Sequence, residues 1–274
     1  MKAAVVQINS GADRSRNIGK AGSLVAAAAD EGAELVVLPE KWSLLGDGAA
    51  LAEGAESSEG EAVTAARGWA RDLGISLLAG SFTETSEDGL PTNTSVLISP
   101  DGGIAAEYRK LHMFDVEAGG VRYRESEHEQ AGGEIATGDA GDLKIGLTIC
   151  YDLRFPELFR ALLDRGVNAF TVPSAFTSAT GRDHWEPLLR ARAIENQAFV
   201  LAANQTGEAD PSYDSWGHSM IVGPWGEVLA EAGEGEGFAC ADLDLAEVED
   251  VRRRLPAVEH RRAEIFREGI VNGS

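Results

Sequence analysis

Two residues that could perform acyl chemistry stand directly behind predicted strands. Cys150 follows the apolar run Leu143–Ile149, and Glu40 follows the run Leu35–Leu38 and a proline. A cysteine thiolate is a nucleophile, and backbone N–H groups at a strand-to-helix turn can bind the oxyanion that forms at an attacked carbonyl. A carboxylate in the same pocket could act as general base. The residue types and their positions therefore fit a cysteine-dependent hydrolase.

Each of these residues also has a simpler interpretation. A lone cysteine is commonly buried and inert, and Glu40 is one of 45 acidic residues, so it could be a solvated loop carboxylate. Lys110, which ends the predicted strand Ile104–Arg109, could be an ordinary surface charge. Cys150 also precedes a predicted helix, and we expect the N-terminus of that helix to stabilise a thiolate.

The segments around the three residues together resemble the nitrilase superfamily of carbon–nitrogen hydrolases. They read Leu-Pro-Glu40, Tyr-Arg-Lys110-Leu-His and Ile-Cys150-Tyr-Asp-Leu-Arg-Phe-Pro-Glu, in the order and at the spacings typical of that superfamily. The resemblance spans nearly the whole chain. It implies an α/β fold, a four-layer α-β-β-α sandwich that commonly pairs into dimers through the helices that cover its sheets.

The resemblance also implies a role for each catalytic residue. Glu40 would take the thiol proton of Cys150, and the sulfur would attack an amide carbonyl and form a thioester. Lys110 and the backbone N–H of Tyr151 would stabilise the oxyanion. The segment Arg-Glu125-Ser resembles a second active-site glutamate of the superfamily, and no cofactor is implied.

Other segments resemble omega-amidases and deaminated-glutathione amidases within the superfamily. They include Pro-Ser-Ala-Phe176, His184-Trp-Glu and Trp216-Gly-His-Ser-Met. Such enzymes act on small amides that carry a carboxylate, so the pocket needs a cation. Arg154 is the candidate clamp for that carboxylate, although it could instead pair with a neighbouring acid such as Glu157.

The predicted substrate-binding residues are therefore Tyr151, Arg154 and Phe176. The chain departs from the branch at Lys41-Trp42, directly after Glu40, and at Arg182-Asp183. Both departures leave the identity of the substrate open.

The element pattern predicts one carbon–nitrogen hydrolase domain over residues 1–274. Strands and helices alternate, as in layered α/β proteins, and neither a linker nor a short tandem repeat is visible. The stretch Glu117–Gly133 is rich in Gly, Glu and Arg and is predicted to be a surface loop, with Glu127-His128-Glu129 facing solvent. A helix is expected over Trp185–Gln197, and Cys240 is expected in the core.

The formal net charge of −21 disfavours binding to nucleic acid or to anionic membranes. The acidic residues are dispersed along the chain, which contains only five lysines, a composition typical of proteins from cells with molar internal salt. We therefore expect a halophilic source, the alternative being an acidic mesophilic enzyme. No apolar run approaches the roughly 20 residues that cross a bilayer, and the N-terminus does not resemble a secretory signal, so we expect a cytoplasmic location.

Two cysteines are too few for a disulfide framework. The five histidines show no ligand spacing typical of a metal site, so no metal is expected. The remaining alternatives are an N-carbamoyl amino acid hydrolase, a nitrilase, a non-catalytic binding protein of the same fold, and a papain-like hydrolase. The last is disfavoured because the residues that flank Cys150 match no such signature.

Overall fold

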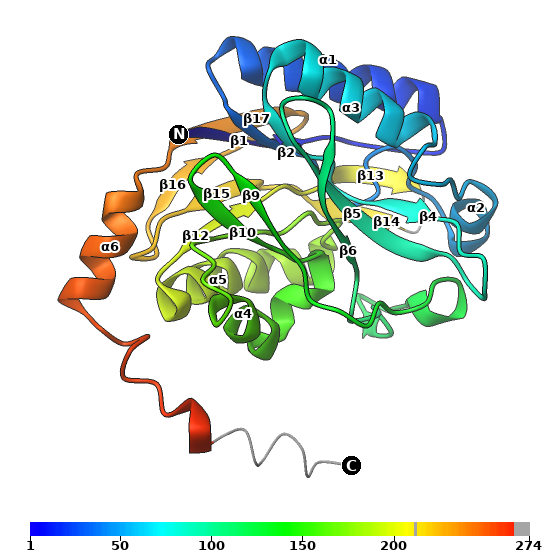
Figure 1. Cartoon of the computed structure of the whole chain (residues 1–274). Coiled ribbons are helices and arrows are strands. Elements are labelled where there is room, and N and C mark those ends of the chain that lie inside the picture. The colour runs from blue at the N-terminus through cyan, green and yellow to red at the C-terminus, as the bar shows by residue number, and fades with distance from the viewer. Residues whose placement is uncertain (211–212, 266–274) are drawn as a thin grey trace.

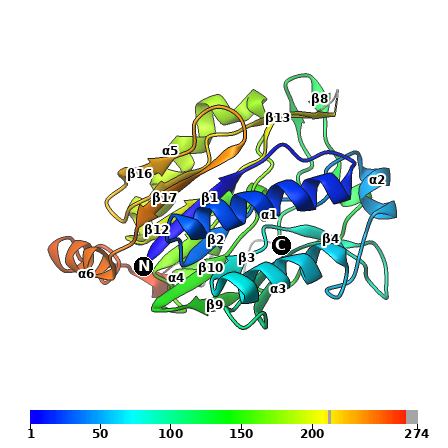
Figure 2. The ribbon, with the colours of Figure 1, turned by 90° about the horizontal axis from the view of Figure 1, so that it is seen from above.

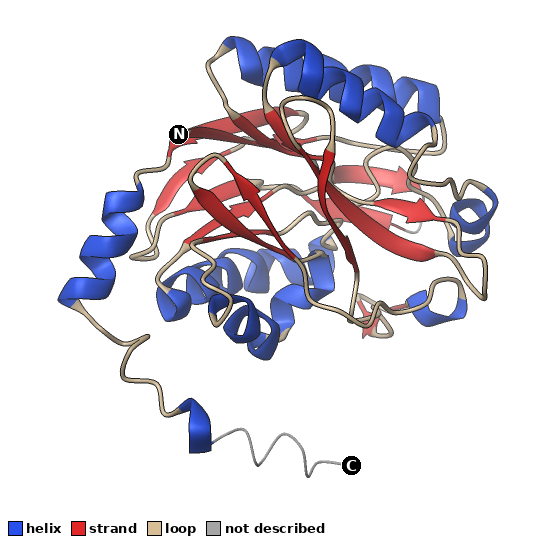
Figure 3. Ribbon diagram, in the orientation of Figure 1, coloured by secondary structure: helices blue, strands red, loops and turns tan. Residues whose placement is uncertain are grey.

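Two β-sheets lie face to face between two layers of helices (Figures 1 and 3). The computed structural model describes residues 1–210 and 213–265. Helices α1 (Arg14–Asp30) and α3 (Glu61–Leu73) cover the outer face of one sheet, and α4 (Pro156–Leu163) and α5 (Ser178–Asn196) cover the outer face of the other. The arrangement confirms the predicted four-layer α-β-β-α sandwich.

The first sheet has the strand order β17-β1-β2-β3-β5-β4, with β6 paired to β5. Its strands are β1 (Lys2–Gln7), β2 (Leu35–Val37), β3 (Ser76–Leu78), β4 (Phe82–Glu84), β5 (Thr92–Ile98), β6 (Ile104–Arg109) and β17 (Gly237–Asp242). Strands β1, β2 and β3 are parallel. Their carboxyl ends therefore lie at one edge, where ligand sites of α/β sheets form.

The second sheet has the order β16-β15-β12-β11-β10-β9. Its strands are β9 (Thr137–Ala140), β10 (Leu143–Leu147), β11 (Ala169–Thr171), β12 (Phe199–Ala202), β15 (Met220–Val222) and β16 (Val228–Glu231). Strands β10, β11 and β12 are parallel. Each sheet thus has a parallel centre with antiparallel strands at its edges.

Alternate residues of the first sheet belong to two different cores. Ala3 and Val5 of β1 pack in the core between the sheets, whereas Ala4 and Val6 pack against the layer of α1 and α3. Successive side chains of a strand point to opposite faces, so a sheet covered on both sides is apolar along its whole length. All four of these residues are fully buried, which explains the continuous apolar runs in the sequence.

Several short elements surround the two sheets. They are the ribbons β7–β8 (Glu117–Ala118, Val121–Arg122) and β13–β14 (Thr206–Asp210, Tyr213–Trp216), the helices α2 (Gly48–Glu53) and α6 (Leu245–Arg254), and the 3₁₀ turns η1 (Glu125–Glu127) and η2 (Cys150–Arg154). Figure 2 shows α6 at the margin of the molecule, away from α1 and α3. No helix within the described residues is long and apolar enough to cross a membrane.

The structure corrects several predicted elements. Helix α5 begins at Ser178 rather than Trp185, and Pro187 lies within it. The stretch Glu117–Gly133 contains β7, β8 and η1, and it turns inward, so that Glu129 is buried rather than solvated. Cys240 is only half-buried. The charge-rich composition of Glu117–Gly133 predicted exposure, but Glu129 is buried because it pairs with Lys41, from another part of the chain.

Candidate active site

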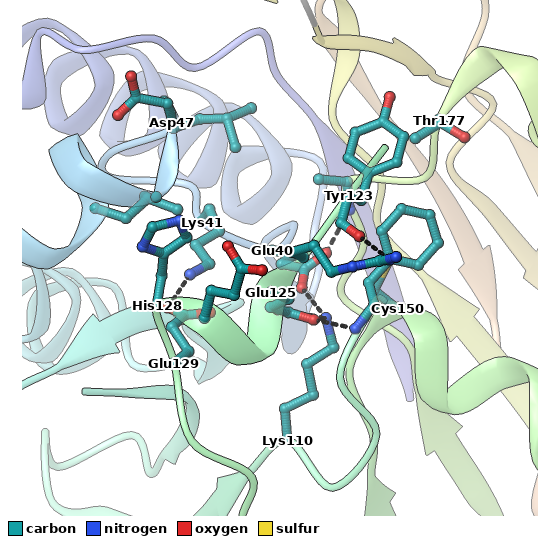
Figure 4. A pocket seen from close by; sticks show the side chains of 18 of the residues that line it. Glu40, Lys41, Asp47, Lys110, Tyr123, Glu125, His128, Glu129, Cys150 and Thr177 are labelled. Carbon is teal, nitrogen blue, oxygen red and sulfur yellow. Dashed lines mark hydrogen bonds and ion pairs between the residues drawn. The ribbon is translucent and has the colours of Figure 1, made fainter. Parts of the chain in front are cut away.

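The three residues predicted to be catalytic come together between the two sheets. Glu40 follows β2 and Lys110 follows β6, both of the first sheet, whereas Cys150 follows β10 of the second sheet. Figure 4 shows Glu40, Glu125 and Cys150 gathered around the end of Lys110. The residues meet because the strand ends that carry them, in two different sheets, lie near one another.

Cys150 occupies a strained turn. Its backbone φ is +47°, in the left-handed region, and its N–H donates to the carbonyl oxygen of Pro173 at 2.8 Å. A non-glycine residue in this region costs roughly 1–3 kcal/mol, and such residues cluster at functional sites. The turn directs the side chain into the space between the sheets, where Cys150 is 7% exposed.

The expectation that a helix N-terminus stabilises a Cys150 thiolate is wrong. Burial and the neighbouring Glu40 carboxylate raise the pKa of the Cys150 thiol well above its usual range, although Lys110 opposes them. Helix α4 begins only at Pro156, and Cys150 itself opens the short turn η2. The resting group is thus a neutral thiol that needs a base.

Glu40 is in position to be that base. Its carboxylate is buried and accepts hydrogen bonds from three sides: Oε1 from Lys110 Nζ at 3.0 Å and from Asn93 Nδ2 at 2.8 Å, and Oε2 from the Ala175 N–H at 2.8 Å. The same carboxylate lies close enough to the Cys150 thiol to raise its pKa. Glu40 is therefore next to the group that must lose a proton and is bound to the cation of the site.

Two glutamates hold Lys110. Its Nζ donates to Glu125 Oε1 at 2.8 Å and Oε2 at 2.9 Å, in addition to Glu40. Burial alone would lower the pKa of Lys110, but Glu125 and Glu40 outweigh it and raise that pKa well above its ordinary value. Lys110 is thus a permanent buried cation, suited to stabilising negative charge on a reacting oxygen.

Glu125 is ionised because the cations around it favour its carboxylate form. Burial disfavours its ionisation, but the charges of Lys110 and Lys41 outweigh this and hold its pKa below the ordinary value. The Phe114 N–H also donates to Glu125 Oε2 at 2.6 Å. Sequence resemblance predicted Glu125 in the site, and the structure places it there; its role remains a prediction.

A cavity of about 630 Å³ opens onto these residues. Phe176, predicted to bind substrate, lines it together with Glu40, Lys110, Glu125 and Cys150. The other lining side chains come mainly from the α2 region and from the segment that contains β8 and η1: Lys41, Leu45, Asp47, Leu51, Phe114, Val121, Arg122, Tyr123, Arg124, Glu127, His128, Glu129, Ala175 and Thr177. A cavity of this volume can hold a small-molecule ligand.

The other two predicted substrate-binding residues lie beside this cavity rather than in its lining. The Arg154 guanidinium packs over the rings of Phe176 and Tyr151, at 5.1 and 5.9 Å from their centroids. Arg154 contacts His184 Nδ1 at 3.3 Å, so its neighbour is a histidine and not the Glu157 considered from the sequence.

Sequence reasoning missed three supporting groups. Asn93, the second residue of β5, donates to Glu40. Asp152 is fully buried behind Cys150 and accepts hydrogen bonds from the Ile149 N–H at 2.9 Å and from Tyr108 Oη at 2.6 Å. Lys41 and Glu129 form a buried ion pair in the cavity wall. Only Lys41 gave a signal, as a departure from the branch that the sequence resembles.

Comparison with known proteins agrees with the geometry. The family model described as Carbon-nitrogen hydrolase matches residues 2–253. The chain is 37% identical to Omega-amidase NIT2 of Danio rerio over 264 residues, 96% of this chain and 95% of the relative. It is 39% identical to the Deaminated glutathione amidase of Synechocystis sp., covering 94% of this chain and 97% of the relative.

A solved structure supports the same assignment. Nit3 of Saccharomyces cerevisiae, described as a member of branch 10 of the nitrilase superfamily, superposes with a TM-score of 0.87 at 32% identity and with 96% of each chain covered. The chain therefore belongs to the carbon–nitrogen hydrolase family, within the nitrilase superfamily.

Proposed function

We propose that this protein hydrolyses a small, carboxylate-bearing amide to the acid and ammonia through a thioester on Cys150, as an omega-amidase does. The observation that carries the proposal is the placement of Glu40, which is bound to Lys110 Nζ and lines the same cavity as the Cys150 thiol, whose pKa its charge raises. The relatives named for omega-amidase and deaminated glutathione amidase activity support the same reaction class.

The first half of the reaction forms the thioester. Glu40 takes the thiol proton as the sulfur attacks the amide carbon, and the carbonyl oxygen becomes an oxyanion. Lys110 and the backbone N–H of Tyr151 stabilise that oxyanion. When the C–N bond breaks, the protonated Glu40 gives its proton to the leaving nitrogen, which departs as ammonia.

The second half releases the acid. A water molecule takes the place of ammonia, and Glu40 removes its proton as the oxygen adds to the thioester carbon. The C–S bond then breaks, the sulfur recovers a proton, and the carboxylic acid leaves. Glu125 holds Lys110 in position throughout, and the cycle consumes one water without a cofactor.

The far end of the substrate needs a cation for its carboxylate. Arg154 is the candidate from the sequence. It lies beside the cavity and packs against Phe176, which lines the cavity. Arg122 and Arg124, which line the cavity directly, are the competing candidates. Arg154→Lys, Arg122→Lys and Arg124→Lys, compared by KM for one substrate, separate them, because a lysine cannot reproduce the bidentate contact of a guanidinium.

The direct test is ammonia release from α-ketoglutaramate, deaminated glutathione, an N-carbamoyl amino acid and a nitrile, with Cys150→Ala beside the wild type. Turnover of an ω-amide, with a mass increment on Cys150 when the reaction is quenched early, supports the proposal. Turnover of the carbamoyl compound or the nitrile instead points to one of the alternative superfamily activities. A folded protein that binds an amide without turnover supports the non-catalytic alternative.

We further propose that the protein is a salt-adapted, cytoplasmic homodimer. The net charge of −21 and the five lysines support salt adaptation, since molar salt shortens the Debye length to about 3 Å and screens the surface repulsion. Exposed Ile194 on α5, Trp225 between β15 and β16, and Leu255 after α6 are apolar side chains that an interface could cover. Light scattering and unfolding measured from 0 to 3 M salt test the dimer and the salt adaptation, and a stable monomer in salt-free buffer contradicts both.

A further inference from the structure

The cavity wall holds a second buried ion pair, one residue away from the catalytic base. Lys41 Nζ pairs with Glu129 Oε1, and the two side chains are only 5% and 2% exposed. Thr83 Oγ1 joins them, accepting from Lys41 Nζ at 3.0 Å and donating to Glu129 Oε1 at 3.1 Å. Figure 4 shows Lys41 and Glu129 facing one another beside Glu125.

Each partner of the pair belongs to a segment that carries an active-site glutamate. Lys41 directly follows Glu40 and has a left-handed backbone, φ +56°, with its N–H bound to Ser81 Oγ at 3.1 Å. The Glu129 N–H donates to the Glu125 carbonyl oxygen at 2.9 Å. The pair therefore joins the turn after β2 to the segment that carries Glu125, which are far apart in the sequence.

Stability alone does not account for such a pair. Desolvating two charges costs about as much as their attraction returns, and apolar residues of similar volume commonly serve a core equally well. The charges do, however, reach the catalytic groups. Lys41 is among the cations that hold the pKa of Glu125 low. Burial raises the pKa of Glu129, which Lys41 opposes and the charge of Glu125 reinforces.

Several charged or titratable groups surround Glu125 from the neighbouring segments. They are Lys110 after β6, Glu40 and Lys41 after β2, Cys150 after β10, Asp115 and Arg124 on its own loop, and Glu129.

We propose that the Lys41–Glu129 pair is a positioning device for the hydrolytic reaction, which locks the Glu125 segment onto the Glu40 turn and so fixes Lys110 between two carboxylates. This inference rests on the proposed function. Neither residue touches the reacting atoms; they act through Glu125 and Lys110. A displacement of about 1 Å at such a site can cost a hundredfold in rate.

The test compares Lys41→Met, Glu129→Gln and the double variant Lys41→Met/Glu129→Leu. Each single variant lowers kcat about tenfold to a hundredfold, with KM changed much less, because the reacting groups are misplaced while substrate contacts remain. The double variant folds with wild-type stability or better, since no unpaired charge is left, and yet keeps the low kcat. Lys2→Met and Glu234→Gln make the same charge changes away from the cavity and serve as controls.

The pH profile of kcat/KM separates this role from a merely structural one. Loss of Lys41 removes a positive charge that favours the Glu125 carboxylate, so the pKa of Glu125 rises and the acid limb moves to higher pH. Loss of the Glu129 carboxylate does not move the limb to higher pH, because Lys41 keeps its charge and still favours the Glu125 carboxylate. Limbs that move upward together, or a double variant with wild-type kcat, overturn the proposal.

Alkylation of Cys150 by iodoacetamide, in a Cys240→Ser background, keeps this test independent of the substrate. Displacement of Glu40 changes the rate of alkylation in the single and double variants, because the Glu40 charge raises the pKa of the Cys150 thiol and the thiolate is the form that reacts. If the wild type releases no ammonia from any amide, the proposed function fails, and the alkylation rates alone then decide on the ion pair. Unchanged rates in all three variants overturn it.

Discussion

The two sheets contribute different chemistry to one site. The first sheet and the loop that follows it supply the ionic groups, Glu40, Lys110 and Glu125, each of them buried or half-buried. The second sheet supplies the nucleophile, Cys150, and the Ala175 backbone N–H that binds Glu40. Charge is thus concentrated on one side of the interface between the sheets, and the reacting atom lies on the other.

This division shows why the chemistry depends on how the sheets pack together. Lys110 and its two carboxylates could neutralise one another within the first half of the molecule. Glu40 joins the halves within the catalytic group, with Oε1 bound to Lys110 and Oε2 to Ala175. The acid–base function therefore rests on a contact between residues 135 positions apart in the chain.

Removal of the thiol has the largest expected effect, because it eliminates what the second sheet contributes to the reaction. Cys150→Ala loses amidase turnover by at least about 10⁴-fold. Stability changes little, since the thiol is small and the strained backbone remains. Ammonia release and denaturant unfolding check the two parts. Residual turnover within tenfold of the wild type would show that another group is the nucleophile.

Glu40→Gln removes the charge of the residue that links Lys110 to Ala175 and keeps the size of its side chain. The loss of the general base lowers kcat about 10²- to 10⁴-fold. The Glu40 charge raises the pKa of Cys150 in the wild type, so its removal must lower that pKa. Thiolate absorbance near 240 nm, titrated in a Cys240→Ser background, then appears at lower pH in the variant. A pKa unchanged or higher in the variant contradicts the electrostatic coupling between the sheets.

Lys110→Met removes a charged group that the first sheet supplies and leaves the nucleophile of the second sheet unchanged. Loss of an oxyanion partner costs about 10²- to 10³-fold in kcat, and the uncompensated carboxylates destabilise the fold by about 3–5 kcal/mol. Burial raises the pKa of Glu125 and Lys110 is the largest charge that opposes it, so without Lys110 the folded-state pKa of Glu125 rises above its unfolded value. The variant therefore loses most stability at neutral and alkaline pH and recovers part of it as the pH falls through that raised pKa toward the unfolded value of about 4.3. Urea unfolding at pH 5 and pH 8 checks this, and equal losses at both values contradict it.

Asp152→Asn perturbs the support of the nucleophile rather than the reacting groups. Asp152 holds the turn through the Ile149 N–H and bonds across the sheets to Tyr108. Burial and Asp152 raise the pKa of Tyr108, which therefore stays a proton donor. An amide cannot accept every hydrogen bond that the carboxylate accepts, and we expect a loss of about 1–3 kcal/mol. Stability above that of the wild type would contradict this account.

A surface ion pair gives the smallest expected effect and marks the contrast with the buried cluster. Asp250 of α6 pairs with Arg254 at 3.0 Å on an exposed face. Asp250→Asn should change stability by less than about 0.5 kcal/mol, because exposed pairs are weak in water. Thermal unfolding of this variant and of Lys110→Met, measured together, checks whether the loss of a charge reduces stability strongly only where the charge is buried.

Much of the fold could be predicted because local patterns carried it. Runs such as Leu35–Leu38 and Leu143–Ile149 are apolar on both faces and became the strands β2 and β10, with small shifts at their ends. Helix α5 was predicted seven residues short at its start. The contributions of α2 and of the ribbons β7–β8 and β13–β14 could not be seen, because short elements have little periodicity.

The sequence by itself determined which residues stand behind the strands, and hence the candidates Glu40, Lys110 and Cys150 and the family they indicate. Tertiary structure decided what surrounds them, because burial and pairing depend on segments distant in the chain. It turned the expected thiolate into a neutral thiol, brought Glu129 into the interior against Lys41, and left Arg154 beside the cavity. The local sequence shows which residues are charged, but only the packing of distant segments determines whether a charge is solvated or paired.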